Sequence, residues 1–513
     1  MKLFNFLKKQ VSLVKFAAVC SILNLVLYNI PFVLFVVDHA DFSNASHWLL
    51  VASVGLLLVT LNFFAFYLLV FLFRVVGKVL LALFALLNGV CSYFVVTYHN
   101  FMDGAMMSNV LNTRFSEAAG FFTWQLVVFS LVFGVLPAVL ILLQRTDRGT
   151  WKSLCKWTGG SLAASVLLVL INFNQVLWIG KYETELGGLV MPWGYTANMI
   201  RMVNARFAEQ KEEIKLPDAQ FTDDEKSVLV LVIGESARKA NFQLYGYDRP
   251  TNPKLSELTD LHVFNARSCA TYTTAGVKSI LEYKETSDLY EILPNYLFRT
   301  GADVVWRTSN WGEPPVHIKE YLKKEELAAT YHWDNPNHDE LLTQGLKERI
   351  MSSDKNKVFI VLHTSTSHGP EYQTHYPAQF EIFAPIADNV EDARKDLKKL
   401  HNAYDNTIVY TDHILRGIID SLRTLDGWHA AMIYVSDHGE SLGEDGLFMH
   451  GVPMSIAPSE QYEIPFLLWH NDSTRTVANP QQPIDQHHVF HTVIDWFNVK
   501  TPVHDKQKSL FKN

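Results

Sequence analysis

The sequence predicts two classes of structure in one chain, an all-α membrane-spanning domain followed by an α/β domain. Strongly apolar segments of the 513-residue chain are concentrated before residue 181, whereas short β-branched runs alternate with helix-like charged stretches after about residue 226. This alternation predicts a mainly parallel sheet with helices on both faces. We therefore expect a membrane domain over 1–181, a bridging helix and linker over 182–225, and an exported domain over 226–513.

Five apolar segments predict five transmembrane helices. Each has about 20 residues or a few more, enough for a helix to cross a hydrocarbon core of about 30 Å. They nearly lack charges, which is uncommon for buried helices of soluble proteins. Lysine and arginine gather before the first segment and in the second and fourth connections, so these parts should stay in the cytoplasm and everything after the fifth segment should be exported. The segments are 16–37, 49–73, 79–97, 122–143 and 157–179.

Composition limits the partners and the covalent cross-links of the exported domain. A net charge of -8 and the lack of a basic stripe with interleaved aromatic residues argue against nucleic acid as a partner. Cys269 is the one cysteine after residue 181, so no disulfide can form within the exported part. We expect a free thiol there.

Five apolar runs in the exported part predict strands, and helices fit between them. Residues 195–220 turn polar, with apolar residues at helical spacing, which fits an amphipathic helix on the membrane surface or a helix packed on the exported domain. The strand candidates are Val228–Ile233, Asp303–Arg307, Val358–His363, Ala431–Val435 and Phe466–Trp469.

Metal-ligand side chains follow several of these predicted strands. Glu235 follows the first strand, His368 the third, and Asp437 with His438 the fourth, while His450 could return from the next loop. Carboxylate oxygens and imidazole nitrogens are ligands for a zinc-like ion. A single Asp-His pair is more often a polar turn, but α/β folds keep their chemistry at the carboxyl ends of strands. Several such ends together predict a metal site.

Three threonines precede a helix-like run. Thr271, Thr273 and Thr274 could each cap that helix, which is the common role of threonine at such a position. Any of the three could also be a nucleophile, because coordination to a dication stabilises the alkoxide of an otherwise weak hydroxyl nucleophile. The residue types alone leave these alternatives open.

Five motifs, in order behind the apolar segments, resemble those of the phosphoethanolamine transferases, a family that includes colistin-resistance enzymes acting on lipid A. The resemblance implies an alkaline-phosphatase-like domain in the periplasm, on a multi-pass protein of the inner membrane of a Gram-negative bacterium. It also implies phosphatidylethanolamine as donor and a lipopolysaccharide acceptor. The motifs are Gly234-Glu-Ser-Ala-Arg238, Ser268-Cys-Ala-Thr-Tyr-Thr273, His368-Gly-Pro370, Asn402-Ala-Tyr-Asp-Asn406 and Ser436-Asp-His-Gly-Glu-Ser-Leu-Gly443.

The resemblance assigns the metal site residue by residue. Matching positions for a tightly bound zinc are Glu235, Thr273, Asp437 and His438. Thr273 is chosen among the threonines because it stands four residues after Cys269, and it would be the nucleophile that carries phosphoethanolamine. The family usually bridges that cysteine to one ten residues later, where this chain has Ser279.

Further positions match substrate contacts of the family. His368 and His450 match histidines that lie near the phosphate and can hold a second zinc, and Asn310 matches a contact to the headgroup. A lysine used for the headgroup in related enzymes aligns with Pro314, so this contact differs here.

The loop between the third and fourth apolar segments carries a polar stripe. Asn109, Thr113 and Glu117 are four residues apart and would share one face of a helix. They match positions that line the lipid-substrate pocket of the family, while an ordinary solvated helix face remains the alternative.

Other functions fit parts of the pattern. A phosphoglycerol transferase of the lipoteichoic-acid-synthase type shares the five spans and the threonine, and transfer to periplasmic glucans would use the same site. A plain phosphatase or sulfatase would not need the spans. A catalytically dead membrane scaffold would not need the metal ligands, so a zinc measurement separates it.

Overall fold

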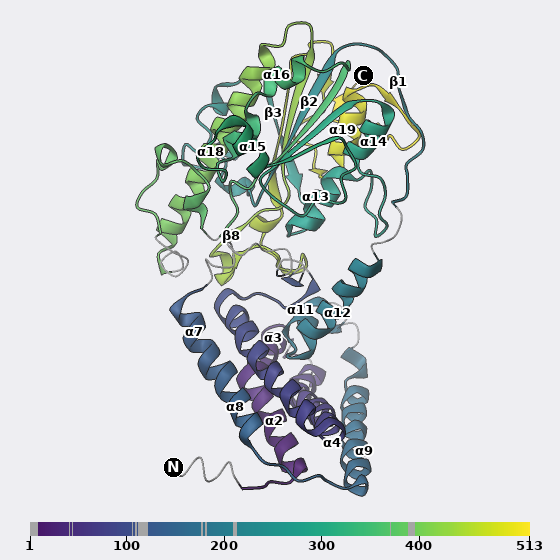
Figure 1. The fold of residues 1–513 in the computed structure, drawn as a ribbon, viewed down its shortest axis with the longest axis vertical. Coiled ribbons are helices and arrows are strands. Elements are labelled where there is room, and N and C mark those ends of the chain that lie inside the picture. Colours follow the sequence, from purple (N-terminus) through teal and green to yellow (C-terminus); the bar gives the residue numbers. More distant parts are fainter. Residues whose placement is uncertain are drawn as a thin grey trace. The chain divides into compact units, whose positions relative to one another are not determined.

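The computed structural model (Figure 1) divides into two compact units, Met1–Phe207 and Ala208–Asn513. The division falls within the segment 182–225 that the sequence predicts as a bridge. The structure describes residues 9–40, 42–43, 45–104, 106–107, 110, 122–175, 178–179, 182–208, 213–369, 371–387 and 395–512.

The first unit is helical over the part that the structure describes. Threonine side chains cap two of its helices: Thr123 accepts a hydrogen bond from Leu126 N, and Thr150 accepts one from Ser153 N. The main helices are α2 (Leu13–Tyr28), α3 (Ile30–Asp38), α4 (Ala45–Tyr98), α7 (Trp124–Ser130), α8 (Leu136–Leu143), α9 (Trp151–Ile171), α11 (Glu183–Leu189) and α12 (Trp193–Ala208).

Among the described residues, three helices are long and apolar enough to cross a membrane, namely His47–Tyr98, Trp124–Leu143 and Trp151–Ile171. Helices α2 and α3, bent by 57°, make a fourth if the pair is one span. At about 1.5 Å per residue, a straight helix of the 52 residues of His47–Tyr98 would far exceed a hydrocarbon core of about 30 Å. The backbone leaves the helical conformation at Arg74, with φ 41° and ψ -97°, between the second and third predicted segments. The five-span count stays a prediction.

An eight-stranded sheet forms the centre of the second unit. All neighbouring strands are parallel except around β10, which is antiparallel to both β3 and β7. The five predicted strands are confirmed as β2, β4, β6, β7 and β10, while β3, β5 and β12 were not expected. In spatial order the strands are β12 (Ile484–Asp485), β3 (Leu261–Arg267), β10 (Glu463–His470), β7 (His429–Ser436), β2 (Ser227–Gly234), β6 (Lys357–His363), β4 (Asp303–Thr308) and β5 (Glu320–Lys323).

Helices cover both faces of this sheet, as predicted (Figure 1). Every residue of β2 is buried, which explains its uninterrupted apolar sequence. Its alternate side chains enter two different apolar cores. Val228, Val230 and Val232 share one core with α18 (Leu397–Arg423). The opposite side chains share the other core with α13 (Thr273–Leu281), α14 (Leu293–Thr300) and α19 (His488–Trp496).

The carboxyl ends of three parallel strands meet at one edge of the sheet. Ile233 of β2 pairs with His363 of β6 and with Val435 of β7, so the loops that follow start side by side. Helix α13 approaches the same edge closely: a Cβ atom on Gly276 would lie 2.2 Å from the carbonyl oxygen of Asp437. The absence of a side chain at Gly276 therefore permits this contact.

We expect Gly276→Ala to lower the melting temperature of the full-length, detergent-solubilised protein, because overpacking costs about 1–3 kcal/mol. Gly417→Ala in α18 is the matched control, since nothing outside its own stretch of helix backbone lies within 4 Å of its Cβ position. At Gly417 only the higher helix propensity of alanine acts, so the melting temperature of Gly417→Ala should equal or exceed that of the wild type. Equal melting temperatures for the two variants would contradict the close contact.

The charge pattern of the loops predicts opposite compartments for two reporter fusions. A fusion after residue 148 should report the cytoplasm and one after residue 181 the periplasm, because positively charged loops remain inside. Alkaline phosphatase and green fluorescent protein fusions measure this. The same compartment at both points would rule out the five-span arrangement.

Candidate active site

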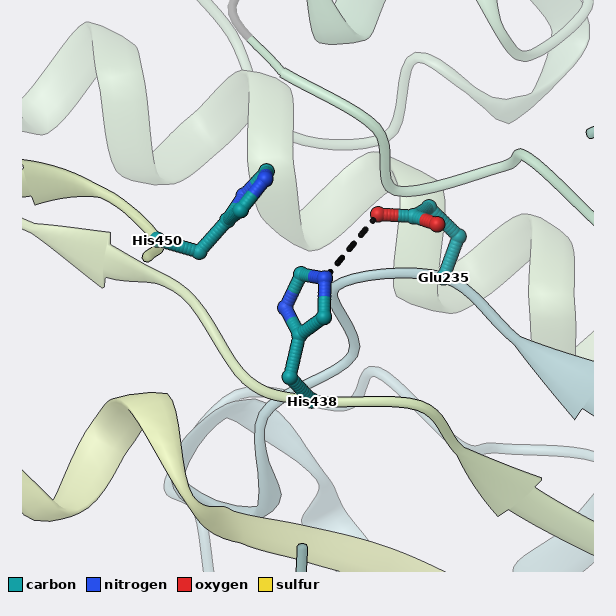
Figure 2. Close-up of side chains that lie close together, drawn as sticks. All are labelled: Glu235, His438 and His450. Carbon is teal, nitrogen blue, oxygen red and sulfur yellow. Dashed lines mark ion pairs between the residues drawn. The ribbon is translucent and has the colours of Figure 1, made fainter. Parts of the chain in front are cut away.

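Seven side chains singled out in the sequence of the second unit all follow strands or begin a helix. Figure 2 shows three of them, Glu235, His438 and His450, pointing toward one another from different loops. Each position has a simple origin in the fold. Glu235 follows β2, Asn310 follows β4, His368 follows β6, Asp437 and His438 follow β7, His450 follows β9 (Phe448–Met449), and Thr273 is the first residue of α13.

Four of these side chains form one tight cluster. The Thr273 Oγ1 atom lies 3.2 Å from His438 Nε2 and 3.5 Å from Glu235 Oε2. His438 Nε2 lies 3.5 Å from Glu235 Oε1 and 3.3 Å from Asp437 Oδ2. All four residues are buried. The structure thus brings together the residues that the family resemblance assigns to the metal.

The protonation pattern of His438 makes this cluster a set of converging acceptors. Its Nδ1 lies 2.8 Å from the carbonyl oxygen of Gly439, which can only accept, so Nδ1 carries the hydrogen. The lone pair of Nε2 is then left facing the carboxylates of Glu235 and Asp437. Asp437 Oδ2 is buried and accepts no hydrogen bond. A cation satisfies such acceptors, so the donor set fits a divalent metal.

The pKa shifts of Asp437 and His438 agree with this description. Burial and the neighbouring carboxylate of Glu235 raise the pKa of Asp437 well above its usual range. Burial and the nearby His450 lower the pKa of His438 to about 3, which keeps its imidazole neutral. A cation would thus favour the charged form of Asp437, and His438 is already in the neutral form that can bind a metal.

His450, which the resemblance does not assign to the tightly bound zinc, also lies close to the metal-ligand atoms. The ligand atoms of Glu235, His438 and His450 all lie within 4.8 Å of one another, so His450 is also within reach of a metal. Its Nδ1 lies 2.9 Å from Glu440 Oε2, and Tyr372 donates to the other oxygen of Glu440 at 2.9 Å. Burial disfavours the imidazolium of His450, but the Glu440 carboxylate outweighs it and raises the pKa. This contact leaves His450 Nε2 for a ligand.

Backbone and amide donors hold the carboxylates in place. Asp437 Oδ1 accepts from the N–H groups of Ser236, at 3.0 Å, and His438, at 2.7 Å. Asn310 Nδ2 donates to Glu235 Oε2 at 2.7 Å, and Ser236 Oγ donates to Glu235 Oε1 at 2.8 Å. Ser236 adopts a positive φ of 52°, which is unfavourable for a non-glycine residue and commonly found at functional sites.

Thr273 occupies a position suited to an anion as well as to a metal. It is the first residue of α13, where helix N–H groups lack partners within the helix and the helix dipole favours negative charge. Thr271 instead donates to the carbonyl of Val452 at 2.7 Å, which is a structural contact. A phosphate ester at Thr273 would therefore be stabilised by its surroundings.

Of the remaining predicted residues, His368 lies near the cluster and the polar stripe is not described by the structure. The ring of His368 lies 6.2 Å, centre to centre, from that of His450. Asn109, Thr113 and Glu117 lie outside the described residues, so their predicted role in lipid binding stays a prediction.

Sequence reasoning missed Ser236 and Glu440. Both belong to the motifs named above and stand close to predicted ligands, so the motifs could have indicated a role for them in the site. Their hydrogen bonds to Glu235 and His450 give each of them a definite contact in the site.

Comparisons with known proteins match both units of the chain. A family model described as phosphoethanolamine transferase EptA/EptB matches residues 58–207, and a sulfatase model matches residues 227–499. The structure of the integral membrane lipooligosaccharide phosphoethanolamine transferase A from Neisseria meningitidis superimposes with a TM-score of 0.85 and covers 98% of this chain and 99% of that one. At 24% identity this match establishes the fold.

Sequence relatives extend the match to function. Phosphoethanolamine transferase EptA of Helicobacter pylori is 39% identical over 426 residues, covering 81% of this chain and 80% of the relative. The protein of the same name from Escherichia coli K12 is 30% identical over 417 residues, covering 77% and 76%. The chain therefore belongs to the phosphoethanolamine transferase family.

Proposed function

We propose that this protein transfers phosphoethanolamine from phosphatidylethanolamine to a lipopolysaccharide acceptor, either lipid A or a core sugar. The observation that carries the proposal is the Thr273 hydroxyl, 3.2 Å from His438 Nε2 and at the start of a helix. Family membership supports the transferred group. Relatives whose names specify Kdo(2)-lipid A support the class of acceptor.

The proposed cofactor is zinc, held by Glu235, Thr273, Asp437 and His438. When bound, it would stabilise the threonine alkoxide and neutralise charge on the phosphate oxygens. His450, with Glu440 behind it, and His368 would contact the phosphate or hold a second ion. Asn310, which is bonded to Glu235, would contact the ethanolamine headgroup from the same edge.

Transfer then takes place in two steps. In the first, an O–P bond forms between Thr273 Oγ1 and the phosphorus, while the bond from phosphorus to the diacylglycerol oxygen breaks. Thr273 loses its proton and the departing diacylglycerol oxygen gains one. In the second, an acceptor oxygen forms the new O–P bond while the bond between phosphorus and Thr273 Oγ1 breaks; the acceptor hydroxyl loses its proton and Thr273 gains one. The phosphoethanolamine group rests on Thr273 between the steps.

The lipid nature of both substrates explains the membrane unit. We place the protein in the inner membrane of a Gram-negative bacterium, with five spans and the α/β unit in the periplasm. The stripe of Asn109, Thr113 and Glu117 would take part in binding the lipid donor. An enzyme anchored in this way meets both lipids at the membrane surface.

Mass spectrometry of envelope glycolipids, with and without this protein, tests the proposal. We expect the mass of phosphoethanolamine to be added to lipid A or to a core fragment. A phosphoglycerol addition would instead support the rival transferase, and a modified periplasmic glucan would identify a different acceptor. Unchanged glycolipids and glucans would contradict phosphoethanolamine transfer.

Thr273→Ala should abolish transfer while the protein remains folded. Loss of a nucleophile generally costs many orders of magnitude in rate, because no other group can carry the intermediate. Glu235, Asp437 and His438 should still bind zinc in part, measurable by elemental analysis. Peptide mapping of the wild-type protein given phosphatidylethanolamine should find the adduct on Thr273.

Thr274→Ala is the matched control, since it removes the neighbouring hydroxyl from the same helix turn. Its adduct should still form on Thr273. Substantial transfer by Thr273→Ala, or an adduct on Thr271 or Thr274 in the wild type, would show that the nucleophile is assigned wrongly.

Removal of metal should both inactivate and destabilise the protein. A ligand that binds the native state alone stabilises it by RT ln(1 + [L]/Kd), about 2.7 kcal/mol at 100 times Kd. Dialysis against a chelator should therefore lower the melting temperature, and added zinc should restore both melting temperature and transfer. Full activity of protein shown to be metal-free would exclude the metal from the mechanism.

A further inference from the structure

The two loops that carry the chemistry leave strands that are not neighbours in the sheet. Thr273 lies beyond the end of β3, whereas Asp437 and His438 follow β7. Strand β10 lies between β3 and β7 and runs antiparallel to both. The two loops therefore do not follow strands that pair with each other; each is instead hydrogen-bonded through its backbone to residues 460–462, just before β10.

The side chain of Gln486 joins the nucleophile loop directly to the turn after β7. Its Oε1 accepts a hydrogen bond from the backbone N–H of Cys269 at 2.9 Å. Its Nε2 donates to the carbonyl oxygens of Ser436, at 3.0 Å, and Asp437, at 2.6 Å. Gln486 has no exposed surface, so water cannot easily replace these bonds.

The fold places Gln486 at this point. It follows β12, whose residues Ile484 and Asp485 pair in parallel with Ala266 and Arg267 of β3. The chain after β12 therefore runs beside the chain after β3. His487, the next residue, has its Nδ1 3.5 Å from Cys269 Sγ.

Other hydrogen bonds of the nucleophile loop lead elsewhere. Ser268 N donates to the carbonyl of Tyr462 at 2.8 Å, just before β10. Gly451 N donates to the carbonyl of Thr271, and Thr271 Oγ1 donates to the carbonyl of Val452. These contacts fix the loop against the 451–462 region, which also accepts hydrogen bonds from the N–H groups of Gly439 and Glu440 after β7. Gln486 connects the loop to the turn after β7 directly.

We propose that Gln486 is a positioning residue for transfer, which holds the Thr273 loop at a fixed distance from Asp437 and His438. This inference rests on the proposed function, since the geometry matters only if Thr273 attacks a phosphate. The chain has no second exported cysteine to brace the loop covalently. The buried amide of Gln486 provides a direct hydrogen-bonded connection between the loop and the turn.

Two substitutions in the full-length protein separate the acceptor from the donors of this amide. Gln486→Met removes both, whereas Gln486→Glu keeps an acceptor for Cys269 N–H and loses the two donors. With phosphatidylethanolamine as donor and lipopolysaccharide as acceptor in mixed micelles, continuous diacylglycerol release reports turnover. We expect kcat to fall roughly 10- to 100-fold in both, the scale of a small misplacement of reacting groups. KM and zinc content should stay close to wild type.

Gln481→Met is the matched control. Gln481 lies five positions earlier, on the exposed loop before β12, and has one long contact of 3.4 Å from Asn265 Nδ2. Its kcat, KM and zinc content should equal those of the wild type. A general effect of replacing glutamine by methionine, or of altered expression, would appear in both variants alike.

The rate of Cys269 alkylation gives a second readout that does not depend on activity. Mapping the alkylated peptide distinguishes Cys269 from the other cysteines. In the folded protein, Gln486→Met should increase the rate several-fold because the loop loses a restraint, while Gln481→Met should leave it unchanged. If the wild type releases no diacylglycerol, the proposed function fails, yet the alkylation rates still test the connection.

Two results would contradict placement of Thr273 by Gln486, and a third would give Gln486 a different role. One is a kcat within about twofold of wild type for Gln486→Met, far below the loss expected for misplaced reacting groups. The other is an alkylation rate at Cys269 that does not change. A loss of activity that zinc content fully accounts for would likewise assign Gln486 to metal retention and not to placement of Thr273.

Discussion

The convergence of acceptor atoms from Glu235, Asp437 and His438 is the constraint around which the second unit is organised. Burying two carboxylates beside an imidazole lone pair is unfavourable on its own, because like partial charges repel at low dielectric. The fold holds them there with backbone and amide donors, and it leaves Asp437 Oδ2 without a hydrogen bond. The surroundings oppose relaxation of these groups and thereby preserve a site for a cation.

Helix α18 supports this arrangement from one face of the sheet. Tyr404 accepts a hydrogen bond from the N–H of Arg238 at 2.9 Å and donates to the carbonyl of Ser236 at 2.7 Å. The Arg238 guanidinium in turn contacts the carbonyl of Glu440 at 3.1 Å and the carboxylate of Glu444 at 2.7 Å. The Asn402–Asn406 motif, which had no role assigned from sequence, therefore supports the turn that carries Glu235.

The sequence predicted strands and residues that obey simple rules and missed those that depend on distant contacts. The strands β2, β6 and β7 are continuous buried runs, so their apolar sequences were sufficient to predict them as strands. Strand β3 has only two buried residues, Phe264 and Ala266, and β12 has two residues in all, so neither produces a clear pattern.

The same distinction applies to the site. Glu235, Asp437 and His438 follow predicted strands, whereas Gln486 follows a strand too short to detect. Its importance is visible only once β12 is paired with β3. Likewise, the buried Asp339 accepts hydrogen bonds from Ser365 and Thr366 beside β6, yet no motif surrounds it.

The hydrogen bond between Cys269 and Gln486 joins residues 217 positions apart. Contacts of such long sequence separation form late, because the entropy of closing the intervening chain opposes them until other structure is present. A chain that is still being synthesised can already contain Thr273 and lack the segment that holds its loop. The arrangement proposed around Thr273 would therefore be complete only when folding of the second unit is nearly finished.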